Sequence, residues 1–285
     1  MHNSLIFGII SILVAIIVSV LFLTNFTIEQ EKIVENVVEP SNNLLKLQIN
    51  SLFNVYGYEN DYEVIDGKKI WQNVEYKLKK ENQLLYNEIS NNDEKNIVVV
   101  YPIFTAAAYS EPGFYTYYRG ECDDECLTIT INENYPLSYQ ASGDAIQILS
   151  LLNYPIITDI DIDQDPSLLS KFDKVILLHN EYVTKTEFDA ITSHPNVIYL
   201  YPNALYAEVS FDNENYTITL VRGHNYPEIT IRNGFDWEYD NSELEYDNTC
   251  LDMKFEKIEN GAMLNCYPEN IIHKSKNLLK HIKEF

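Results

Sequence analysis

One segment of the chain, residues 172–209, constrains the fold more than any other stretch of the sequence. It opens with an apolar run, residues 174–178, of the kind that forms a buried parallel strand. Thr184 and Glu187 then have the spacing of a capping box, which predicts that a helix begins there. A second apolar run, residues 197–200, predicts the next strand. Strand, loop, helix, strand and loop in this order are typical of a parallel α/β sheet.

Polar residues occupy both loops of this unit. His179 and Glu181 follow the first strand, and Asn203 follows the second. In open α/β sheets, ligands bind in the crevice at the carboxyl ends of the strands, where both loops fall. His179 and Glu181 are two residues apart, so an extended backbone directs both side chains to one face. We therefore expect a catalytic group of His179, Glu181 and Asn203. The alternative is that Glu181 caps the helix and His179 makes a local hydrogen bond.

Two short motifs in the loops resemble those of a known family. The first is H-N-E-Y-V-T and the second is N-A-L-Y-A-E-V. They are similar to the H-D-E-Y-W-[ST] and N-A-x-Y-W-x-V motifs of the large subunit of N,N-dimethylformamidase and its relatives, which have a glutamine-amidotransferase-like α/β domain. Asn180, Val183 and Ala207 replace the Asp and the two Trp residues of those motifs. The resemblance covers roughly residues 97–209.

The resemblance implies a chemistry for the loop residues. Proteins of that family hold one ferric ion through two tyrosines and a glutamate, and they hydrolyse small amides. By position, Glu181 matches the glutamate, His179 the nearby histidine and Asn203 the asparagine. Ferric iron prefers phenolate and carboxylate oxygen, and it can polarise an amide carbonyl and acidify a bound water. Iron is thus the cofactor that the resemblance implies, with the histidine as proton carrier and the asparagine as partner of the oxyanion.

The tyrosine ligands match less closely, because the chain has 22 tyrosines. Tyr109, just after the first strand of the expected core, is the better candidate for a metal ligand. Tyr139, ahead of the following helix, is the second candidate, and Tyr135 competes with it. Each of these residues also has a simpler interpretation, as a half-buried packing residue whose hydroxyl is satisfied.

Four segments are expected along the chain, and together they predict an α/β fold. Residues 1–26 form a membrane anchor, and residues 27–95 form a helical stalk or N-terminal layer, because apolar residues recur there at helical spacing. Residues 96–209 form the α/β core around a parallel sheet, which is glutamine-amidotransferase-like or flavodoxin-like by resemblance. Residues 210–285 form a C-terminal antiparallel β extension that includes a terminal helix.

An apolar run of about nineteen residues, residues 5–23, has the length needed to span a bilayer. It lacks the basic region and the small-residue cleavage site of a signal peptide, which favours an uncleaved anchor. The long acidic remainder indicates that the bulk of the chain lies outside the cytoplasm. We therefore expect a single-pass membrane protein that contacts lipid through residues 5–23 and is placed to meet a membrane-protein partner.

The four cysteines form two close pairs in the sequence. Outside the cytoplasm the simplest pattern is two disulfides, Cys122–Cys126 and Cys250–Cys266, although four cysteines allow three connectivities. A structural zinc site is the alternative, but the spacing lacks the C-x-x-C of a zinc ribbon.

The net charge of the chain excludes one class of function. Its 43 acidic and 20 basic residues give a formal charge of −23, which argues against nucleic-acid binding. Two hypotheses follow. The first is a non-catalytic surface or membrane-complex subunit, which the replaced motif residues favour. The second is a metal-assisted hydrolase of small amides, whose substrate the sequence does not name.

Overall fold

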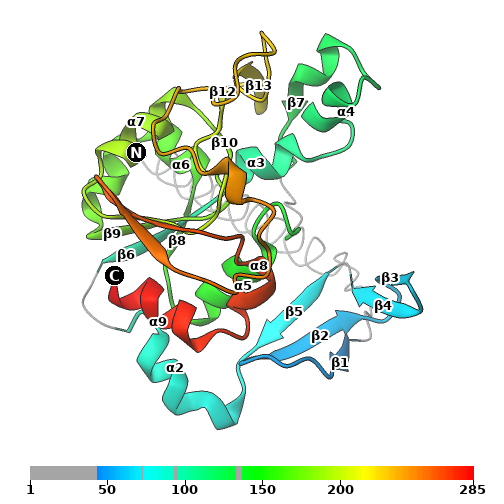
Figure 1. Ribbon diagram of the computed structural model, residues 1–285, viewed down its shortest axis with the longest axis vertical. Coiled ribbons are helices and arrows are strands. Elements are labelled where there is room, and N and C mark those ends of the chain that lie inside the picture. The colour runs from blue at the N-terminus through cyan, green and yellow to red at the C-terminus, as the bar shows by residue number, and fades with distance from the viewer. Residues whose placement is uncertain (1–43, 72, 93–95, 133–136) are drawn as a thin grey trace, which may run out of the picture. The chain divides into compact units, whose positions relative to one another are not determined.

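A computed structural model describes residues 44–71, 73–92, 96–132 and 137–285 of the chain, and Figure 1 shows the arrangement of its helices and strands. Within these ranges, no helix has both the length and the apolar character needed to cross a membrane. The predicted anchor, residues 5–23, lies outside the described residues.

The core of the protein is a six-stranded sheet with the strand order β14-β15-β11-β9-β6-β8. Its strands are β6 (Ile97–Tyr101), β8 (Ile156–Thr158), β9 (Lys174–Leu177), β11 (Val197–Tyr199), β14 (Phe255–Ile258) and β15 (Gly261–Leu264). All neighbouring strands pair in parallel except the edge strand β14, which is antiparallel to β15. The expected α/β fold with a parallel sheet is therefore confirmed.

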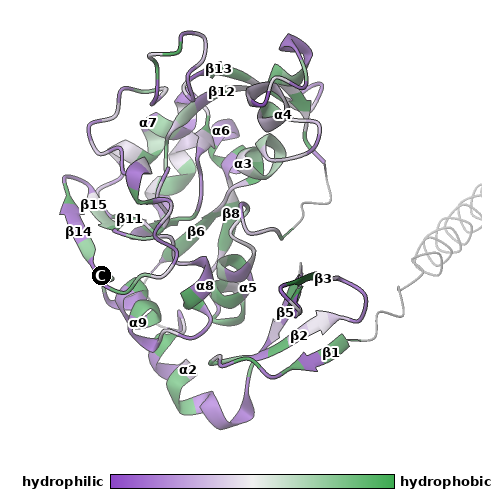
Figure 2. Cartoon of the chain, turned by 45° about the vertical axis from the view of Figure 1, so that its right-hand side comes forward, coloured by the Kyte–Doolittle hydropathy of each residue, from purple (hydrophilic) through white to green (hydrophobic). Residues whose placement is uncertain are grey.

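Side chains from the two faces of this sheet enter two separate hydrophobic clusters. In β6, Ile97 and Val99 join one cluster, whereas Val98 and Val100 join the other, as the alternation of a strand requires. The first cluster includes residues of α2 (Gln83–Ile89), α5 (Gly143–Leu151), α8 (Glu269–Ile272) and α9 (Lys276–Glu284), and the second includes residues of α6 (Asp159–Gln164) and α7 (Lys185–Ser193). Because helices cover both faces, the central strands are buried along their length, and β6 consists of hydrophobic residues, as Figure 2 shows.

A second sheet of four strands has the order β10-β12-β13-β7. Its strands are β7 (Thr128–Thr130), β10 (Tyr182–Val183), β12 (Ala207–Asp212) and β13 (Thr217–Arg222). Two short helices accompany it, α3 (Ile103–Ala108), which packs against β7 and β10, and α4 (Phe114–Tyr118). The described residues also include four 3₁₀ helices, at Lys80–Asn82, Asp124–Leu127, Pro166–Lys171 and Ser242–Leu244.

The prediction of a helical stalk over residues 27–95 is wrong for most of the residues that the structure describes there. Five short antiparallel strands lie there instead, in a three-stranded sheet of order β1-β2-β5 and a hairpin of β3 and β4. These strands are β1 (Leu44–Leu47), β2 (Asn54–Tyr58), β3 (Tyr62–Ile65), β4 (Lys68–Trp71) and β5 (Val74–Lys77). In such short segments the spacing of apolar residues fits both the helical and the strand periodicity, and tertiary contacts decide which structure forms. The hydroxyl and backbone N–H of Tyr76 bond to Asp144 and Gln147 of α5, which fixes β5 as a strand.

The C-terminal segment, residues 210–285, contains the predicted terminal helix and antiparallel strands, but these strands belong to the sheets of the core. β15 joins the main sheet beside β11, and β12 and β13 complete the second sheet with strands from the core. Gly261 makes the first contact possible, because a Cβ atom at this position would lie 1.8 Å from the carbonyl oxygen of Val197. The sequence pattern of a short strand does not show which strand it will pair with, so the boundary near residue 209 was misplaced.

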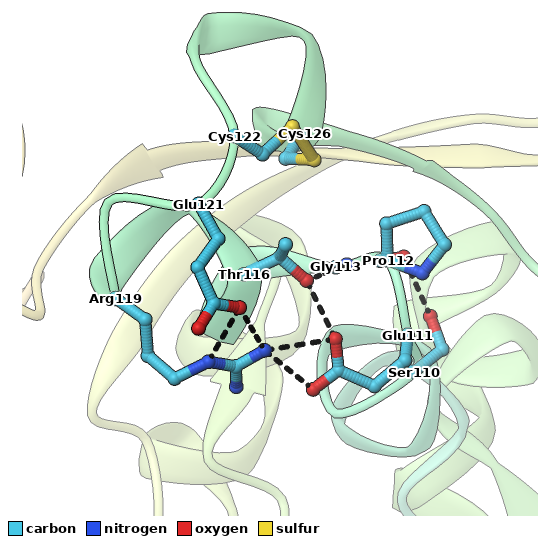
Figure 3. The surroundings of a disulfide bond; sticks show 9 residues. All are labelled: Ser110, Glu111, Pro112, Gly113, Thr116, Arg119, Glu121, Cys122 and Cys126. Atoms are coloured by element: carbon cyan, nitrogen blue, oxygen red, sulfur yellow. Dashed lines mark hydrogen bonds and ion pairs between the residues drawn. A yellow bond between two sulfur atoms is a disulfide. The ribbon is translucent and has the colours of Figure 1, made fainter.

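Both predicted disulfides are present and are confirmed, Cys122–Cys126 and Cys250–Cys266. Near the first, Arg119 forms ion pairs with Glu111 and Glu121, each with a closest approach of 2.9 Å (Figure 3). All four cysteines of the chain are thus paired in disulfides.

Candidate functional site

The two loops that carry the family-like motifs lie side by side after β9 and β11. The backbone N–H of Leu205 donates to the carbonyl of Asn180 at 2.8 Å, and that of Tyr206 donates to the carbonyl of Glu181 at 3.0 Å. Tyr182 of β10 then pairs in parallel with Ala207 of β12. The backbones of the two motifs are therefore hydrogen-bonded to each other, although a helix and a strand separate the motifs in the sequence.

Helix α3 holds the first of these loops in place. The Thr105 hydroxyl accepts hydrogen bonds from the backbone N–H groups of Glu181 at 3.0 Å and Tyr182 at 3.1 Å. Thr105 is completely buried. Tyr109 is the C-cap residue of the same helix, so the residue that anchors the loop and the tyrosine that faces it are held by one short element.

Glu181 is the centre of the site and is 0% exposed. Its Oε2 atom accepts a hydrogen bond from the Tyr109 hydroxyl at 2.8 Å, and the Tyr115 hydroxyl donates to that of Tyr109 at 2.7 Å. Two imidazoles flank the carboxylate. His179 Nε2 lies 3.6 Å from Oε2, and His224 Nε2 lies 3.3 Å from Oε1.

The charge of this cluster follows from its burial and its neighbours. Burial alone raises the pKa of Glu181, but the nearby His224 and His179 imidazoles and the Tyr109 hydroxyl together lower that pKa below its ordinary value. Burial and the Glu181 charge raise the pKa of Tyr109 and of Tyr115. At neutral pH the site is therefore an ionised carboxylate beside two protonated phenols.

His179 presents a lone pair to this carboxylate. Burial lowers its pKa, so the ring is neutral at pH 7. Nδ1 lies 2.9 Å from the carbonyl oxygen of Gln140, and because a carbonyl only accepts, Nδ1 carries the proton. Nε2 therefore bears the lone pair on the side of Glu181, and it has no hydrogen-bond partner in the described part of the chain. Glu181 Oε1 is likewise buried without a partner of hydrogen-bond geometry among the described residues.

Asn203 lies near this cluster but faces another carboxylate. Its backbone is left-handed, with φ at 62°, and its side-chain N–H₂ group donates to Glu245. The predicted catalytic group is thus assembled in part: His179 and Glu181 meet, whereas the hydrogen bond of Asn203 goes to Glu245.

A cavity of about 340 Å³ opens beside the cluster, and every side chain lining it is polar or aromatic. The lining includes Asn203, Tyr206, His224, Arg232, Glu243 and Glu245. Glu181 and His179 lie behind this wall, so His224 is the side chain that both lines the cavity and contacts Glu181. A larger cavity of about 680 Å³ borders α7, but none of the predicted site residues lines it, and we assign no role to it.

The sequence reasoning missed His224, which belongs to the turn after β13. Gly223 has φ at 108°, and a Cβ atom there would lie 3.0 Å from both the Ala207 Cα and the Tyr206 carbonyl oxygen. His224 and Asn225 follow with φ at 54° and 66°. Non-glycine residues held in this region are uncommon and often occur at functional sites. The letters G-H-N after a predicted strand were the available signal, but they do not show that the turn folds back onto Glu181.

The expected tyrosine ligands divide into one that reaches the site and others that do not. Tyr109 bonds to Glu181, but Tyr139 is 40% exposed and stacks on Tyr267, with 4.7 Å between ring centroids. No hydrogen bond joins Tyr139 to Glu181 or Tyr109 in the described ranges. Its competitor Tyr135 lies outside the described residues. Tyr115, which the sequence did not single out, is the second phenol of the cluster.

Among the described residues, no group of three His, Cys, Asp or Glu side chains has the spacing to hold a metal ion, so any metal here depends on tyrosine oxygen.

No protein-family model matches the chain, and no curated protein matches it significantly.

Proposed function

We propose that the protein hydrolyses small amides at the Glu181 cluster, with a hard metal ion such as ferric iron as its cofactor. The observation that carries this proposal is the 2.8 Å contact between Tyr109 Oη and Glu181 Oε2, beside two buried atoms without hydrogen-bond partners, His179 Nε2 and Glu181 Oε1. A bound metal ion accounts for buried electron-pair donors that have no hydrogen-bond partner, as His179 Nε2 and Glu181 Oε1 have none among the described residues.

The donor atoms fit the metal that the resemblance implies. Glu181 supplies a carboxylate, and Tyr109 and Tyr115 supply phenol oxygens 2.7 Å apart, which are the oxygen donors that hard cations such as ferric iron prefer. Tyr115 takes the place that the sequence gave to Tyr139. Burial and the Glu181 charge hold both phenols protonated, and the charge of a cation opposes both effects. When bound, such a metal supplies Lewis acidity for an amide carbonyl and for a water molecule.

The residues that line the cavity supply the rest of the chemistry. The Asn203 amide has two N–H groups and uses one on Glu245, which leaves the other for the carbonyl oxygen of an amide substrate. His224 connects the cavity to Glu181, so we assign to it the proton transfer that the resemblance gave to His179. Water adds to the carbonyl carbon, the C–N bond breaks, and the nitrogen leaves as an amine that takes up a proton. The products are one carboxylic acid and one amine.

The finer fold and the placement of the protein are part of the same proposal. A parallel sheet with a His-x-Glu loop after β9 supports a glutamine-amidotransferase-like core. Two disulfides support a location in an oxidising compartment, outside the cytoplasm, with residues 5–23 as the anchor.

A second function, a non-catalytic subunit of a membrane complex, is favoured by one observation. Glu181 and His179 are 0% and 3% exposed, and neither lines the cavity. In that case the cluster stabilises the two loops and has no substrate.

One experiment separates the two functions. The full-length oxidised chain is incubated with ferric iron, and its metal content, visible absorption and hydrolysis of simple amides are measured. We expect bound iron and a tyrosinate-to-iron band, both lost in Tyr109→Phe and Tyr115→Phe and kept in the matched control Tyr139→Phe. A colourless protein that binds no metal and cleaves no amide refutes the hydrolase and leaves the subunit.

A further inference from the structure

The three arginines of this acidic chain are in different situations. Arg119 is paired with Glu111 and Glu121, and Arg222 makes two hydrogen bonds to Asp236, at 2.9 and 2.8 Å. Arg232 has no ion pair among the described residues. The charges of the first two guanidinium groups are neutralised by neighbouring carboxylates, whereas that of the third is available.

The available guanidinium lines the cavity of the proposed site. Arg232 shares this wall with His224 and Tyr206. Two backbone hydrogen bonds fix it there, because His224 N–H donates to the carbonyl of Arg232 and Asn225 N–H donates to that of Ile231, both at 2.7 Å. The position of Arg232 is thus tied to the histidine that contacts Glu181.

The charges of the other lining residues orient a substrate that carries a carboxylate. Glu245 and Glu243 also line it, and Glu245 is bonded to Asn203. A carboxylate on a substrate is repelled by these two groups and attracted by Arg232, whose planar fork suits bidentate carboxylate binding. In a protein with a formal charge of −23, an anionic ligand needs such a local attraction to enter.

We infer that the substrate is a small amide that also bears a carboxylate, and that Arg232 binds this carboxylate while the amide group lies toward His224 and Asn203. The inference rests on the proposed function, since it names the substrate class of the same site. The polar lining and the volume of about 340 Å³ suit a short molecule without a large apolar group.

The test compares two substrates that differ in one group, the monoamide and the diamide of succinic acid. Hydrolysis of each is measured with the full-length oxidised chain in detergent micelles, after incubation with ferric iron. We expect kcat/KM for the monoamide to exceed that for the diamide by about ten- to hundredfold, as expected for a charged hydrogen bond. Arg232→Gln removes the preference by raising KM for the monoamide alone. Arg232→Lys keeps part of it, and the matched control Arg119→Gln keeps all of it.

Succinate binding, measured by calorimetry on the same variants, separates this inference from the proposed function. Succinate binding that Arg232→Gln abolishes, without hydrolysis of either amide, supports the carboxylate site and refutes the hydrolase. Equal hydrolysis of both amides, unchanged by Arg232→Gln, supports the hydrolase and overturns the inference. Absence of both succinate binding and hydrolysis overturns both the inference and the proposed function.

Discussion

Two buried glutamates in this protein have similar surroundings and opposite ionisation. Glu181 is 0% exposed and Glu269 is 3% exposed, and each accepts a hydrogen bond from a tyrosine hydroxyl, of Tyr109 and Tyr201 respectively. Glu181 has two imidazoles within 3.6 Å, and its pKa is lowered. Burial raises the pKa of Glu269 well above its ordinary value, and the neighbouring charge of Asp144 raises it further.

The difference shows that burial and a tyrosine partner do not by themselves define a functional carboxylate. The neighbouring groups decide whether the carboxyl is ionised, since imidazoles lower the pKa of Glu181 and the Asp144 carboxylate raises that of Glu269. Glu181, held as an anion, can bind a cation or orient an imidazole. Glu269, held as a neutral acid, connects Tyr201 to the backbone of α5, where the Asp144 N–H donates to it at 2.6 Å. We therefore treat the Glu181 cluster as the site and the Glu269 cluster as structure.

The largest expected effect comes from replacing each of the two glutamates with glutamine, which has nearly the same shape and no charge. Glu181→Gln should reduce amide hydrolysis by about a hundredfold or more and abolish iron binding, because it replaces an anionic donor with a neutral amide. Glu269→Gln should leave both properties within about twofold, since Gln resembles a protonated Glu. Rates and bound iron are measured on both variants. Equal losses in the two variants would mean that the comparison is mistaken.

A complete truncation at Glu269 should affect stability instead. Glu269→Ala leaves Tyr201 Oη and the Asp144 N–H unsatisfied and opens a cavity, at a cost of about 2–4 kcal/mol in the free energy of unfolding. Glu269→Gln, the control, should cost under about 1 kcal/mol. Urea unfolding measures both changes. A structural role for Glu269 is excluded if Ala and Gln have the same small effect.

The two clusters should also respond to pH in opposite directions. Burial raises the pKa of Asp144, beside Glu269, from 3.8 to about 6. Between these two pKa values the folded state binds a proton that the unfolded state has lost. The free energy of unfolding therefore falls as the pH rises from 4 to 6, by on the order of 2–3 kcal/mol. The lowered pKa of Glu181 gives stability that is present above pH 4.5 and lost as the pH falls through its folded pKa.

Unfolding by urea between pH 3 and pH 7 measures these slopes. Asp144→Asn should reduce the loss between pH 4 and pH 6, to which the raised pKa of Glu269 also contributes, and Glu181→Gln should remove the loss at lower pH. A slope near pH 5 that Asp144→Asn leaves unchanged would assign the effect to another group.

The smallest effect is expected at Tyr139, which borders the Glu269 cluster without a hydrogen bond to either glutamate. Its ring is 40% exposed and its hydroxyl bonds to neither glutamate, so Tyr139→Phe should change the free energy of unfolding by less than about 0.5 kcal/mol. Iron binding should also be unchanged. If Tyr139→Phe abolishes the visible band, the ligand set includes Tyr139 as the sequence alone suggested, and the assignment of Tyr115 is wrong.

Much of the core could be predicted from local patterns. The apolar runs that became β9 and β11 are buried on both faces of a parallel sheet, and such strands carry a strong signal. Thr184 caps α7 as its spacing with Glu187 indicated. The strands near the N-terminus were misread because residues such as Leu44 and Leu47 fit a helix as well as a strand until their pairing with β2 is known.

The sequence by itself determined the parallel α/β core, the pairing of four cysteines into two disulfides, and the meeting of His179 with Glu181. These features depend on residues that are close in the chain, where periodicity and spacing are strong guides. Only the tertiary structure brought His224 and Tyr115 to the Glu181 cluster and placed Arg232 beside His224 in the cavity wall. These residues come from turns and a short helix far apart in the sequence, and their contacts depend on the packing of whole elements, which no local pattern encodes.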